Sequence, residues 1–493
     1  MSKIPVKRTR HRLLPDDTRV LAKAYFPGEE LLTPGVSRAH LLLERILAIP
    51  ESEVRGLCAE VMERFEHRHD NFARTLELHY EQVAHLVPES ARVSAERRAL
   101  IGAYFTHEYA VEAAALFNPS IVPAPNQAGV PAGALRFLMS VRAVGEGHLS
   151  SIEFRTGLLE ADGGIVIEPA GKRLIGGLRA PPAAFNKARF RTKLQELGLD
   201  NGISAGVLAD LDDTFTQDAL DKALIALERD GPPHAISFET LKIIRMLASS
   251  NYVTTFPADS ALSERVIFPA GPHESRGMED ARFVQFTEAD GSQVYYATYT
   301  AYDGFKILPQ LIETRDFLRF TIKTLNGAAA QNKGMALFPR RIDGKYVMLS
   351  RKDRENLHLA WSDDVQHWAD VTELLRPQEP WELLQIGNCG SPIETDAGWI
   401  VLTHGVGPMR RYAIGALLLR LDDPRKVIGH LTTPLLEPDE DEREGYVPNV
   451  VYTCGAIVHG DALVIPYGFS DAGIGIAQVA IADLLTELTS TGS

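Results

Sequence analysis

Residues 341–351 read RIDGKYVMLSR, and they have the pattern of a β-hairpin. Asp343-Gly344 is a dipeptide that suits the tight turn between two antiparallel strands. The residues after the turn, YVMLS, include the aromatic and β-branched types that are enriched in strands. This segment therefore predicts a turn followed by a strand.

Four other segments repeat the pattern, with turns near Gly133, Asp290, Asp396 and Gly460. They read GVPAGALRFLMSVR, EADGSQVYYATYT, TDAGWIVLTHG and VHGDALVIPYG. The turns at 290, 343 and 396 are 53 residues apart, and the next follows after 64. A strand group that recurs at such a period is typical of a β-propeller. The sequence predicts a mainly β protein with a five-bladed propeller; a β-sandwich with inserted helices is the less favoured alternative.

Helical patterns occupy two other regions. In SRAHLLLERILAI, residues 37–49, the apolar positions recur at helical spacing, and Ser37 is a suitable N-cap. The expected organisation is an N-terminal arm over 1–35, a helical domain over 36–116, and a propeller over 117–485. A helical insertion at about 186–250 accounts for the long gap between the first and second turns.

Composition and charge exclude several functions. The 493 residues carry 51 Lys+Arg and 65 Asp+Glu, which give a net charge of −14. Nucleic acids and anionic membranes require a basic surface, so neither is an expected partner. The basic run KIPVKRTRHR is followed by no apolar stretch, so we expect a solvated arm and no signal peptide.

The three cysteines, Cys58, Cys389 and Cys454, lie far apart and lack metal-ligand spacing. They predict buried thiols in a reducing compartment, and hence a cytoplasmic protein without a bound metal. The sequence does not determine the oligomeric state; a homo-oligomer is possible.

Polar residues border the predicted strands of every blade. Because the inner strands of a propeller end near its axis, these residues are expected to converge on one pocket. The set mixes hydroxyls, amides, carboxylates and cations, as in a sugar-binding site. It comprises Asn118, Ser120, Arg142, Ser150, Glu279, Asp280, Arg282, Tyr299, Asp303, Asn332, Lys333, Arg351, Gln385, Asn388, His404, Asn449, Tyr467 and Asp471.

Several longer segments resemble glycoside hydrolase family 130. They read MEDARFVQF, NKGMALFPRRIDGKYVMLSR, GWIVLTHGV, YAIGALLLRLDDPRKVIGH and EGYVPNVVYTCGAIVHGDALVIPYGFSDAGIGIA. The resemblance covers about residues 117–485, interrupted by the insertion, and it does not include 36–116. It implies a five-bladed propeller that acts on β-mannosides, as a phosphorylase or as a mannosidase.

The resemblance also implies a catalytic acid. Asp280 stands at the position of the family's general acid, whose proton reaches the leaving oxygen through a sugar hydroxyl. Glu279 and Arg282 are then expected to orient this aspartate or hold the sugar. Ala281 replaces the proline that is usual in the family, which changes the stiffness of the turn and not its chemistry.

Phosphate binding is implied at four positions: Lys333, Arg351, His404 and Tyr412. A phosphorylase needs one protein acid, with cations that hold the phosphate dianion against the sugar. An inverting hydrolase needs a second carboxylate, for which Glu274, Glu355 and Asp303 are the candidates. One lysine that is common in the family's phosphorylases is replaced by Gln385.

The expected function is therefore an inverting phosphorylase that uses inorganic phosphate and no cofactor to convert β-mannosides to α-mannose 1-phosphate. Expected substrate-binding residues are Asn118, Ser120, Arg142, Ser150, Glu279, Arg282, Asp303, Asn332 and Asp471. An inverting β-mannosidase, or a carbohydrate-binding propeller without catalysis, are the alternatives. The sequence leaves open the linkage, the acceptor sugar, and the role of 36–116, for which dimerisation or shaping of the acceptor side are the options.

Overall fold

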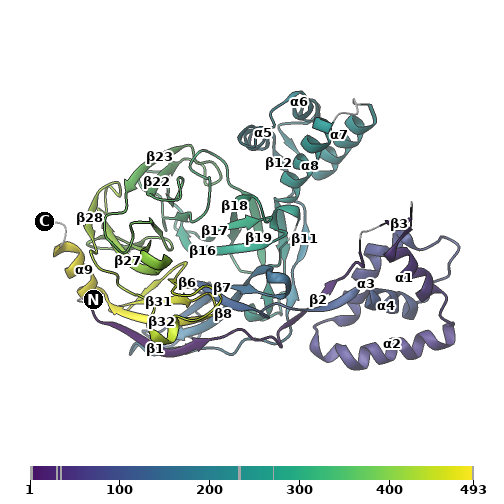
Figure 1. Ribbon diagram of the computed structural model, residues 1–493, viewed down its shortest axis with the longest axis horizontal. Helices are drawn as coiled ribbons and strands as arrows, with labels where there is room; N and C mark the ends of the chain where they lie inside the picture. The colour runs from purple at the N-terminus through teal and green to yellow at the C-terminus, as the bar shows by residue number, and fades with distance from the viewer. Residues whose placement is uncertain (1–3, 29–30, 34–35, 231–234, 270, 491–493) are drawn as a thin grey trace. The chain divides into compact units, whose positions relative to one another are not determined.

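The structure is a computed structural model that describes residues 4–28, 31–33, 36–230, 235–269 and 271–490. The chain divides into two compact units (Figure 1). The larger contains Met1–Pro15, Ala114–Ala170 and Gly177–Ser493, and the smaller contains Asp16–Ala113 and Gly171–Gly176.

The larger unit is mainly β and contains five successive groups of antiparallel strands. The first group is β6 (Ala115–Pro123), β7 (Leu135–Val144), β8 (Ser150–Leu159) and β9 (Ile165–Ile167). The second is β16 (Gly277–Thr287), β17 (Gln293–Tyr302), β18 (Ile307–Thr314) and β19 (Arg319–Thr324), extended by β14 (Tyr252–Thr255) and β11 (Leu178–Ala180). A single parallel pair, Gly277 with Ser150, joins these two groups into one sheet.

The remaining groups are separate sheets. The third is β20 (Ala336–Leu337), β21 (Tyr346–Ser350), β22 (Leu357–Ser362) and β23 (Asp370–Leu375). The fourth is β24 (Gln385–Asn388), β25 (Ile393–Thr395), β26 (Gly398–Val406), β27 (Tyr412–Leu419) and β28 (Val427–His430). The fifth is β29 (Val451–Tyr452), β30 (Ile457–His459), β31 (Ala462–Phe469), β32 (Gly473–Ala480) and β1 (Val6–Leu13).

All five predicted turns join neighbouring antiparallel strands. They connect β6 to β7, β16 to β17, β20 to β21, β25 to β26 and β30 to β31. Asp343 and Gly344 both have positive φ, at 50° and 76°. A tight hairpin turn requires this backbone, which Asp tolerates and glycine adopts freely. The hairpins predicted from turn chemistry are therefore confirmed.

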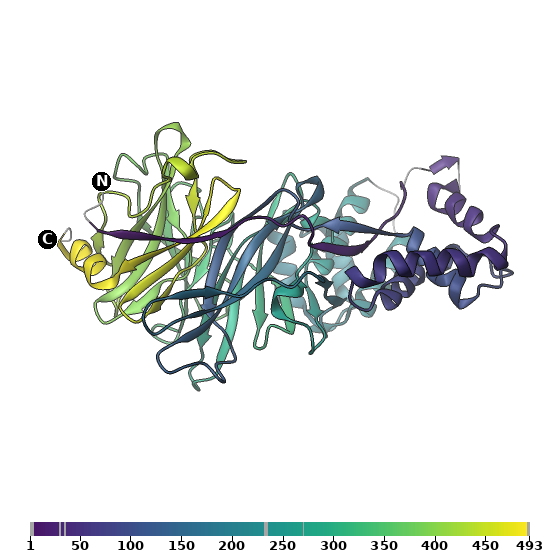
Figure 2. The same cartoon turned by 90° about the horizontal axis from the view of Figure 1, so that it is seen from below.

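The N-terminal basic run differs from its prediction as a solvated arm. Residues Val6–Leu13 form β1, which pairs with β32, and the two run side by side in Figure 2. Arg8 and Arg12 bind the buried carboxylate of Glu442, with nitrogen–oxygen distances of 3.2 and 3.0 Å. The prediction of a solvated arm is wrong for Val6–Leu13, because Arg8 and Arg12 pair with a carboxylate more than 400 positions later in the sequence. Residues 1–3, 29–30 and 34–35 of the predicted arm lie outside the described residues.

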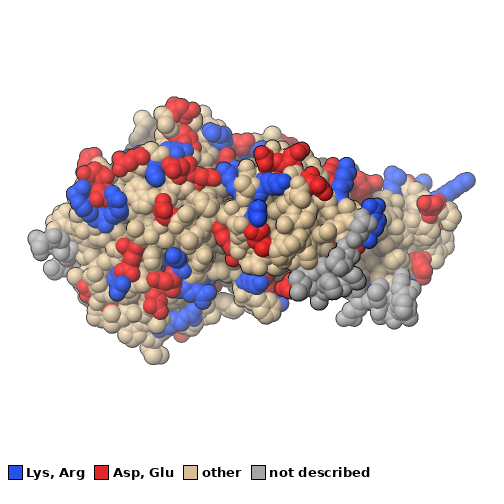
Figure 3. Space-filling model, turned by 90° about the horizontal axis from the view of Figure 1, so that it is seen from above, with Lys and Arg blue, Asp and Glu red and all other residues tan. Residues whose placement is uncertain are grey.

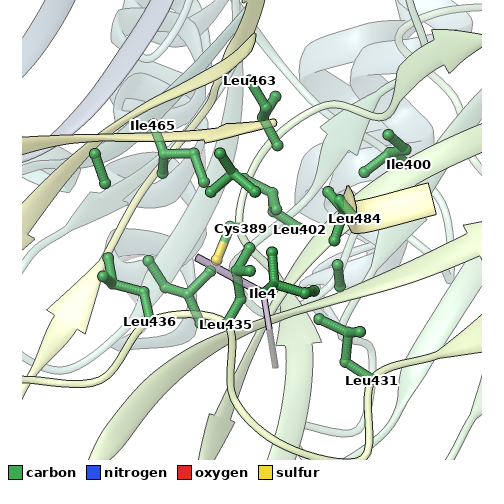
Figure 4. Packing of buried hydrophobic residues seen from close by; sticks show 14 of the residues in the cluster. Ile4, Cys389, Ile400, Leu402, Leu431, Leu435, Leu436, Leu463, Ile465 and Leu484 are labelled. Carbon is green, nitrogen blue, oxygen red and sulfur yellow. The ribbon is translucent and has the colours of Figure 1, made fainter. Parts of the chain in front are cut away.

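Apolar clusters between strand groups form the core of the larger unit. In one cluster, Ile4 packs with Leu402, Leu436, Leu463 and Ile465, so the N-terminus helps to bury the fourth and fifth groups (Figure 4). Leu484 and Leu488 of α9 (Ile481–Ser490) complete this cluster. Burial of apolar area at about 25 cal/mol per Å² makes such clusters the main stabilising contribution.

Four helices lie between the first and second strand groups. They are α5 (Lys187–Glu196), α6 (Gly202–Ala209), α7 (Gln217–Asp230) and α8 (Ala235–Ser249), within the range of the predicted insertion. Their own core includes Phe190, Leu194, Leu220 and Ile244. Residues 231–234 of the predicted insertion lie outside the described part of the chain. The short strands of this larger unit include β12 (Phe185–Asn186), β13 (Thr214–Phe215) and β15 (Arg265–Val266).

The smaller unit is mainly helical. It contains α1 (Arg38–Leu47), α2 (Glu51–Phe65), α3 (Phe72–Val83) and α4 (Ala95–Tyr104), with the short strands β2 (Val20–Ala24), β3 (Leu31–Thr33), β4 (Val36–Ser37), β5 (Thr106–Ala110) and β10 (Ile175–Gly176). Ser37 caps α1 as predicted, because its side chain accepts a hydrogen bond from the His40 amide. The buried guanidinium of Arg97 donates to the carbonyls of Ile46 and Ile49 at 2.7 Å, which ties α4 to the end of α1.

Charged side chains of both signs are interspersed on the face shown in Figure 3. No helix among the described residues is long and apolar enough to cross a membrane. The three cysteines are free thiols; Cys389 and Cys454 are buried as predicted, whereas Cys58 is only partly buried, so the prediction is wrong for it.

Candidate active site

A cavity of about 560 Å³ lies in the larger unit, and all five strand groups, with the loops that join their strands, supply charged or amide side chains to it. Its lining residues are Asn118, Arg142, Glu279, Asp280, Arg282, Tyr302, Phe305, Ile307, Asn332, Lys333, Arg351, Arg354, Gln385, His404, Arg410, Tyr412, Val447, Val450, Tyr452 and Asp471. The volume is in the range of small-molecule sites.

Backbone strain is concentrated around this cavity. Thirteen residues other than glycine have positive φ among those described, and six of them line the cavity. The six are Asn118, Asp280, Asn332, Arg354, Arg410 and Asp471. Such residues persist only where the surrounding structure holds them, and they cluster at functional sites.

Two of these residues sit at irregularities in facing strands. The register of β6 shifts between Phe117 and Ser120, and that of β16 shifts between Glu279 and Arg282. Asn118 has φ of 48° and Asp280 has φ of 56°. A bulge turns a side chain out of the alternation of the strand. As a result the Asn118 amide donates to the Asp280 carboxylate at 2.7 Å.

Arg142 holds both acids of the MEDAR segment. Its Nη2 lies 2.8 Å from Glu279 Oε1, and its Nη1 lies 3.3 Å from Asp280 Oδ1. Lys333 Nζ reaches the other oxygen of Glu279 at 3.7 Å. The charge of Glu279 is therefore neutralised by two cations. In Asp280, the Oδ1 oxygen accepts the hydrogen bonds from both Asn118 and Arg142.

The pKa of Asp280 lies below its ordinary value. Burial acts to raise it, but the positive charges of Arg142, Arg282 and Lys333 lower it by more, and the bond from Asn118 adds to the lowering. Asp280 is therefore ionised at neutral pH in the free protein.

Arg282 makes three hydrogen bonds beside the bulge of β16. Its guanidinium donates to the backbone oxygens of Cys389 and Asp280, both at 2.8 Å, and to the hydroxyl of Tyr452 at 2.7 Å. With these three partners and 2% exposure, its guanidinium is held in place beside the Asp280 backbone.

Arg351 is a buried cation that has no counter-ion among the residues that the structure describes. Its relative exposure is 8%, its Nε has no hydrogen-bond partner, and within the described chain it forms no ion pair. Gly334 and Gly387 leave the space that its side chain occupies. A Cβ at Gly334 would lie 2.8 Å from Arg351 Cδ, and a Cβ at Gly387 would lie 2.5 Å from it. Burying an unpaired charge is costly, so the site is arranged to receive an anion.

His404 is neutral. Burial, followed by the positive charges of Arg351 and Arg282, holds its pKa well below the ordinary value. The centre of its ring lies 6.0 Å from that of the stacked Tyr412 ring and 4.8 Å from that of the Tyr452 ring. A neutral imidazole can donate one hydrogen bond to a ligand, but it adds no charge.

Asp471 contrasts with Asp280. Burial raises the pKa of Asp471 to about 6; the positive charges of Arg142 and Arg410 oppose this, and the charges of Asp280 and Glu279 add to the rise. Two cavity carboxylates therefore have pKa values shifted in opposite directions, a pattern found where acid and base functions are separated.

Most of the predicted site residues line the cavity. They are Asn118, Arg142, Glu279, Asp280, Arg282, Asn332, Lys333, Arg351, His404, Tyr412 and Asp471, with Gln385 beside them. The structure brings these residues together from positions far apart in sequence.

Three predicted substrate-binding residues lie elsewhere. Ser120 is fully buried and accepts the amide of Phe283 at 3.0 Å. Ser150 is fully buried against Gly277, where any Cβ would lie 2.3 Å from the serine oxygen. Asp303 accepts the amides of Phe305 and Lys306 at 2.8 and 2.6 Å, so it shapes a turn. The prediction is corrected for all three, because Ser120 and Asp303 accept backbone amides and Ser150 is packed tightly against Gly277.

The candidates for a second carboxylate also lie outside the cavity lining. Glu274 is fully buried and accepts from Tyr299 at 2.5 Å and Tyr252 at 3.3 Å. Glu355 is exposed on the loop between β21 and β22. The described residues contain no group of three or more His, Cys, Asp or Glu side chains placed to hold a metal ion.

Sequence reasoning missed several lining residues, which are Tyr302, Phe305, Ile307, Arg354, Arg410, Val447, Val450 and Tyr452. Phe305 is 96% exposed, and such exposure of a large aromatic cannot be read from sequence. Arg354 lies three residues after Arg351, in SRKDREN, which reads as a solvated turn. No feature of the sequence points to a role of Arg354 in the site, apart from its position near Arg351, a predicted phosphate ligand.

Comparisons with known proteins agree with the geometry. The family model of glycoside hydrolase family 130, described as beta-1,4-mannooligosaccharide phosphorylase, matches residues 255–489. A 1,2-beta-oligomannan phosphorylase of Thermoanaerobacter sp. (strain X514) is 38% identical over 218 residues, which are 43% of this chain and 71% of the relative.

A second relative and a solved structure are both named as beta-1,2-mannobiose phosphorylases. A beta-1,2-mannobiose phosphorylase of Listeria innocua is 34% identical over 230 residues, which are 45% of this chain and 63% of the relative. A solved structure of a Listeria innocua beta-1,2-mannobiose phosphorylase with beta-1,2-mannobiose covers 77% of this chain and 92% of its own, with 23% identity and a TM-score of 0.43. The chain belongs to glycoside hydrolase family 130, and it is an enzyme acting on β-mannosides, a glycoside phosphorylase or a glycosidase.

Proposed function

We propose that the protein is an inverting phosphorylase that cleaves β-mannosides with inorganic phosphate and releases α-mannose 1-phosphate. The observation that carries this proposal is Arg351, a buried guanidinium in the cavity lining without an ion pair among the described residues. A phosphate dianion supplies the missing charge, and arginine binds it through two parallel hydrogen bonds.

The neighbours of Arg351 suit the same ligand. Lys333 is 49% exposed and holds Glu279 only at 3.7 Å, so it is free to turn towards a second anion. Neutral His404 and the hydroxyl of Tyr412 can donate hydrogen bonds to phosphate oxygens. We assign phosphate binding to Lys333, Arg351, His404 and Tyr412.

Asp280 is the proposed general acid, and phosphate helps to protonate it. The cations that lower the Asp280 pKa include Lys333, which is also a proposed phosphate ligand. A bound dianion offsets this positive field and raises the Asp280 pKa, so the acid becomes competent when the co-substrate is present. Its proton goes to the leaving oxygen and is replaced by the proton of HPO₄²⁻, so the reaction releases no net proton.

Phosphorolysis is favoured over hydrolysis by the placement of carboxylates. A hydrolytic base must hold a water near the anomeric carbon. Glu274, Glu355 and Asp303 do not line the cavity, and Glu279 is bound to Arg142. An inverting β-mannosidase stays the alternative, with Asp471 as its base, because the Asp471 pKa of about 6 suits that role.

We further propose that the five strand groups are the blades of a five-bladed propeller over 117–485. Its support is the succession of five antiparallel groups and the pairing of β1 with β32, which completes the last group with the N-terminus. In this arrangement the helical 36–116 region is an accessory domain, and the cytoplasm remains the predicted location.

A product assay tests the function. The protein is incubated with β-1,2- and β-1,4-linked mannobiose, with and without inorganic phosphate, and products are separated by anion-exchange chromatography. We expect mannose 1-phosphate only when phosphate is present. Free mannose at equal rates in both incubations identifies a hydrolase.

A further inference from the structure

The active-site cavity carries more positive charge than one phosphate requires. Six lining residues are Arg or Lys and three are Asp or Glu, although the whole chain has a net charge of −14. The cations are Arg142, Arg282, Lys333, Arg351, Arg354 and Arg410, and the carboxylates are Glu279, Asp280 and Asp471. A phosphate dianion neutralises two of the three surplus charges. At least one remains, and a further one appears when Asp280 carries its proton.

Arg354 and Arg410 contribute two of these positive charges, and neither is among the proposed phosphate ligands. Arg354 lies in the loop between β21 and β22, and Arg410 lies in the turn Pro408–Arg410 between β26 and β27. Neither forms an ion pair within the part of the chain that the structure describes. The guanidinium carbon of Arg410 lies 5.8 Å from the centre of the Tyr412 ring, which leaves its N–H groups available.

Both arginines are held in a strained backbone. Their φ angles are 74° and 55°, in the left-handed region that is unfavourable for a residue with a Cβ. Arginine, unlike Asn or Asp, has no short side-chain hydrogen bond that compensates for this conformation. Two strained, unpaired arginines on the lining of one cavity point to a ligand that both contact.

Their exposure separates them from the phosphate group. Arg351 is buried, whereas Arg354 and Arg410 are both exposed. The released part of a β-mannoside must leave through the solvent-facing side of the cavity. The exposed arginines therefore belong to the side where the acceptor binds.

We propose that the acceptor is a sugar acid, so that the natural substrate is a β-mannoside whose reducing-side unit carries a carboxylate bound by Arg354 and Arg410. This inference rests on the proposed phosphorolysis and names its substrate class. The planar guanidinium matches a carboxylate through paired hydrogen bonds, and one negative charge balances the surplus that phosphate leaves.

The synthetic direction tests the proposal. The protein is given α-mannose 1-phosphate with glucose, mannose, glucuronic acid or glucose 6-phosphate, and phosphate release is measured. We expect kcat/KM for glucuronic acid to exceed that for glucose by on the order of tenfold to a hundredfold. A neutral hexose used as well as glucuronic acid overturns the proposal. Preference for glucose 6-phosphate overturns the carboxylate and assigns the arginines to a phosphate ester.

Variants locate the effect. In the Arg354→Asn/Arg410→Asn double variant, the ratio of kcat/KM for glucuronic acid to that for glucose falls towards one. Asn tolerates left-handed backbone, so the melting temperature should stay equal or rise. Lys352→Asn removes an exposed charge from the same loop outside the cavity lining, and it should leave the ratio unchanged. An unchanged ratio in the double variant, or an equal loss in Lys352→Asn, contradicts the assignment.

Direct binding separates this inference from the proposed reaction. If no acceptor releases phosphate, the phosphorylase proposal fails, and calorimetric titration with glucuronic acid and glucose still tests the arginines. Tighter binding of glucuronic acid, lost in the double variant, supports the sugar-acid site. Equal affinity for the two sugars overturns it.

Discussion

Substitution of Arg351 by Met is expected to change phosphate use and protein stability in opposite directions. Methionine keeps an unbranched stem in the space that Gly334 and Gly387 leave, and it removes the charge. In the free protein this charge is 8% exposed, and no acid pairs with it among the described residues. Replacing a buried unpaired cation by an apolar side chain should stabilise the protein by about 1–2 kcal/mol.

Phosphate binding should weaken at the same time. Two charge-assisted hydrogen bonds at about 1.5–3 kcal/mol each correspond to a loss of about 3–6 kcal/mol. Since about 1.4 kcal/mol is a factor of ten, kcat/KM for phosphate should fall by about two to four orders of magnitude.

The assay measures mannose 1-phosphate formation over a phosphate series, together with melting curves with and without phosphate. Wild-type protein should be stabilised by phosphate, by about 2.7 kcal/mol at a hundredfold excess over Kd, and Arg351→Met should not. Lys352→Met, which removes the adjacent exposed charge, is the matched control. A lower melting temperature with an unchanged phosphate KM would refute the reasoning, because Arg351 would then be a structural residue.

Three further predictions concern the same cavity. Asp280→Asn should abolish turnover and leave the free energy of unfolding within about 1 kcal/mol of that of wild type, because Asn accepts the φ of 56° at this position; near-normal activity would remove the acid assignment. Gly387→Ala places a Cβ 2.5 Å from Arg351 Cδ and 2.6 Å from His404 Cε1, so phosphate KM should rise more than tenfold with little change in mannoside KM, as measured in separate substrate series. Asp471 binds its proton more tightly in the folded state, with a pKa of about 6, than in the unfolded chain, so its contribution to stability is lost as pH rises from about 4 to 6. Asp471→Asn should therefore raise the melting temperature at pH 7.5 relative to wild type and leave the difference near zero at pH 3.5; an equal shift at both pH values contradicts the titration.

The hairpins could be predicted from sequence because their cause is local. Asp343-Gly344 and the turns at Gly133, Asp290, Asp396 and Gly460 take conformations that only a few residue types adopt cheaply. The acid–arginine segment at 279–282 and the cations at 333 and 351 were also found, since their residue types and order resemble a known family. The hairpins and these short segments could be recognised because each is defined by residues that are close together in the sequence.

Other features were decided by the tertiary structure. Arg8 and Arg12 of β1 find their counter-ion in Glu442, and Ser120, Ser150 and Asp303 were lost from the site because backbone amides or tight packing occupy them. A side chain's exposure, its counter-ions and its pKa depend on groups brought close by folding. Sequence alone was therefore enough for the hairpins and for most of the polar residues that line the site, whereas the three-dimensional arrangement added further lining residues such as Arg354 and Arg410 and decided which cations remain unpaired among the described residues.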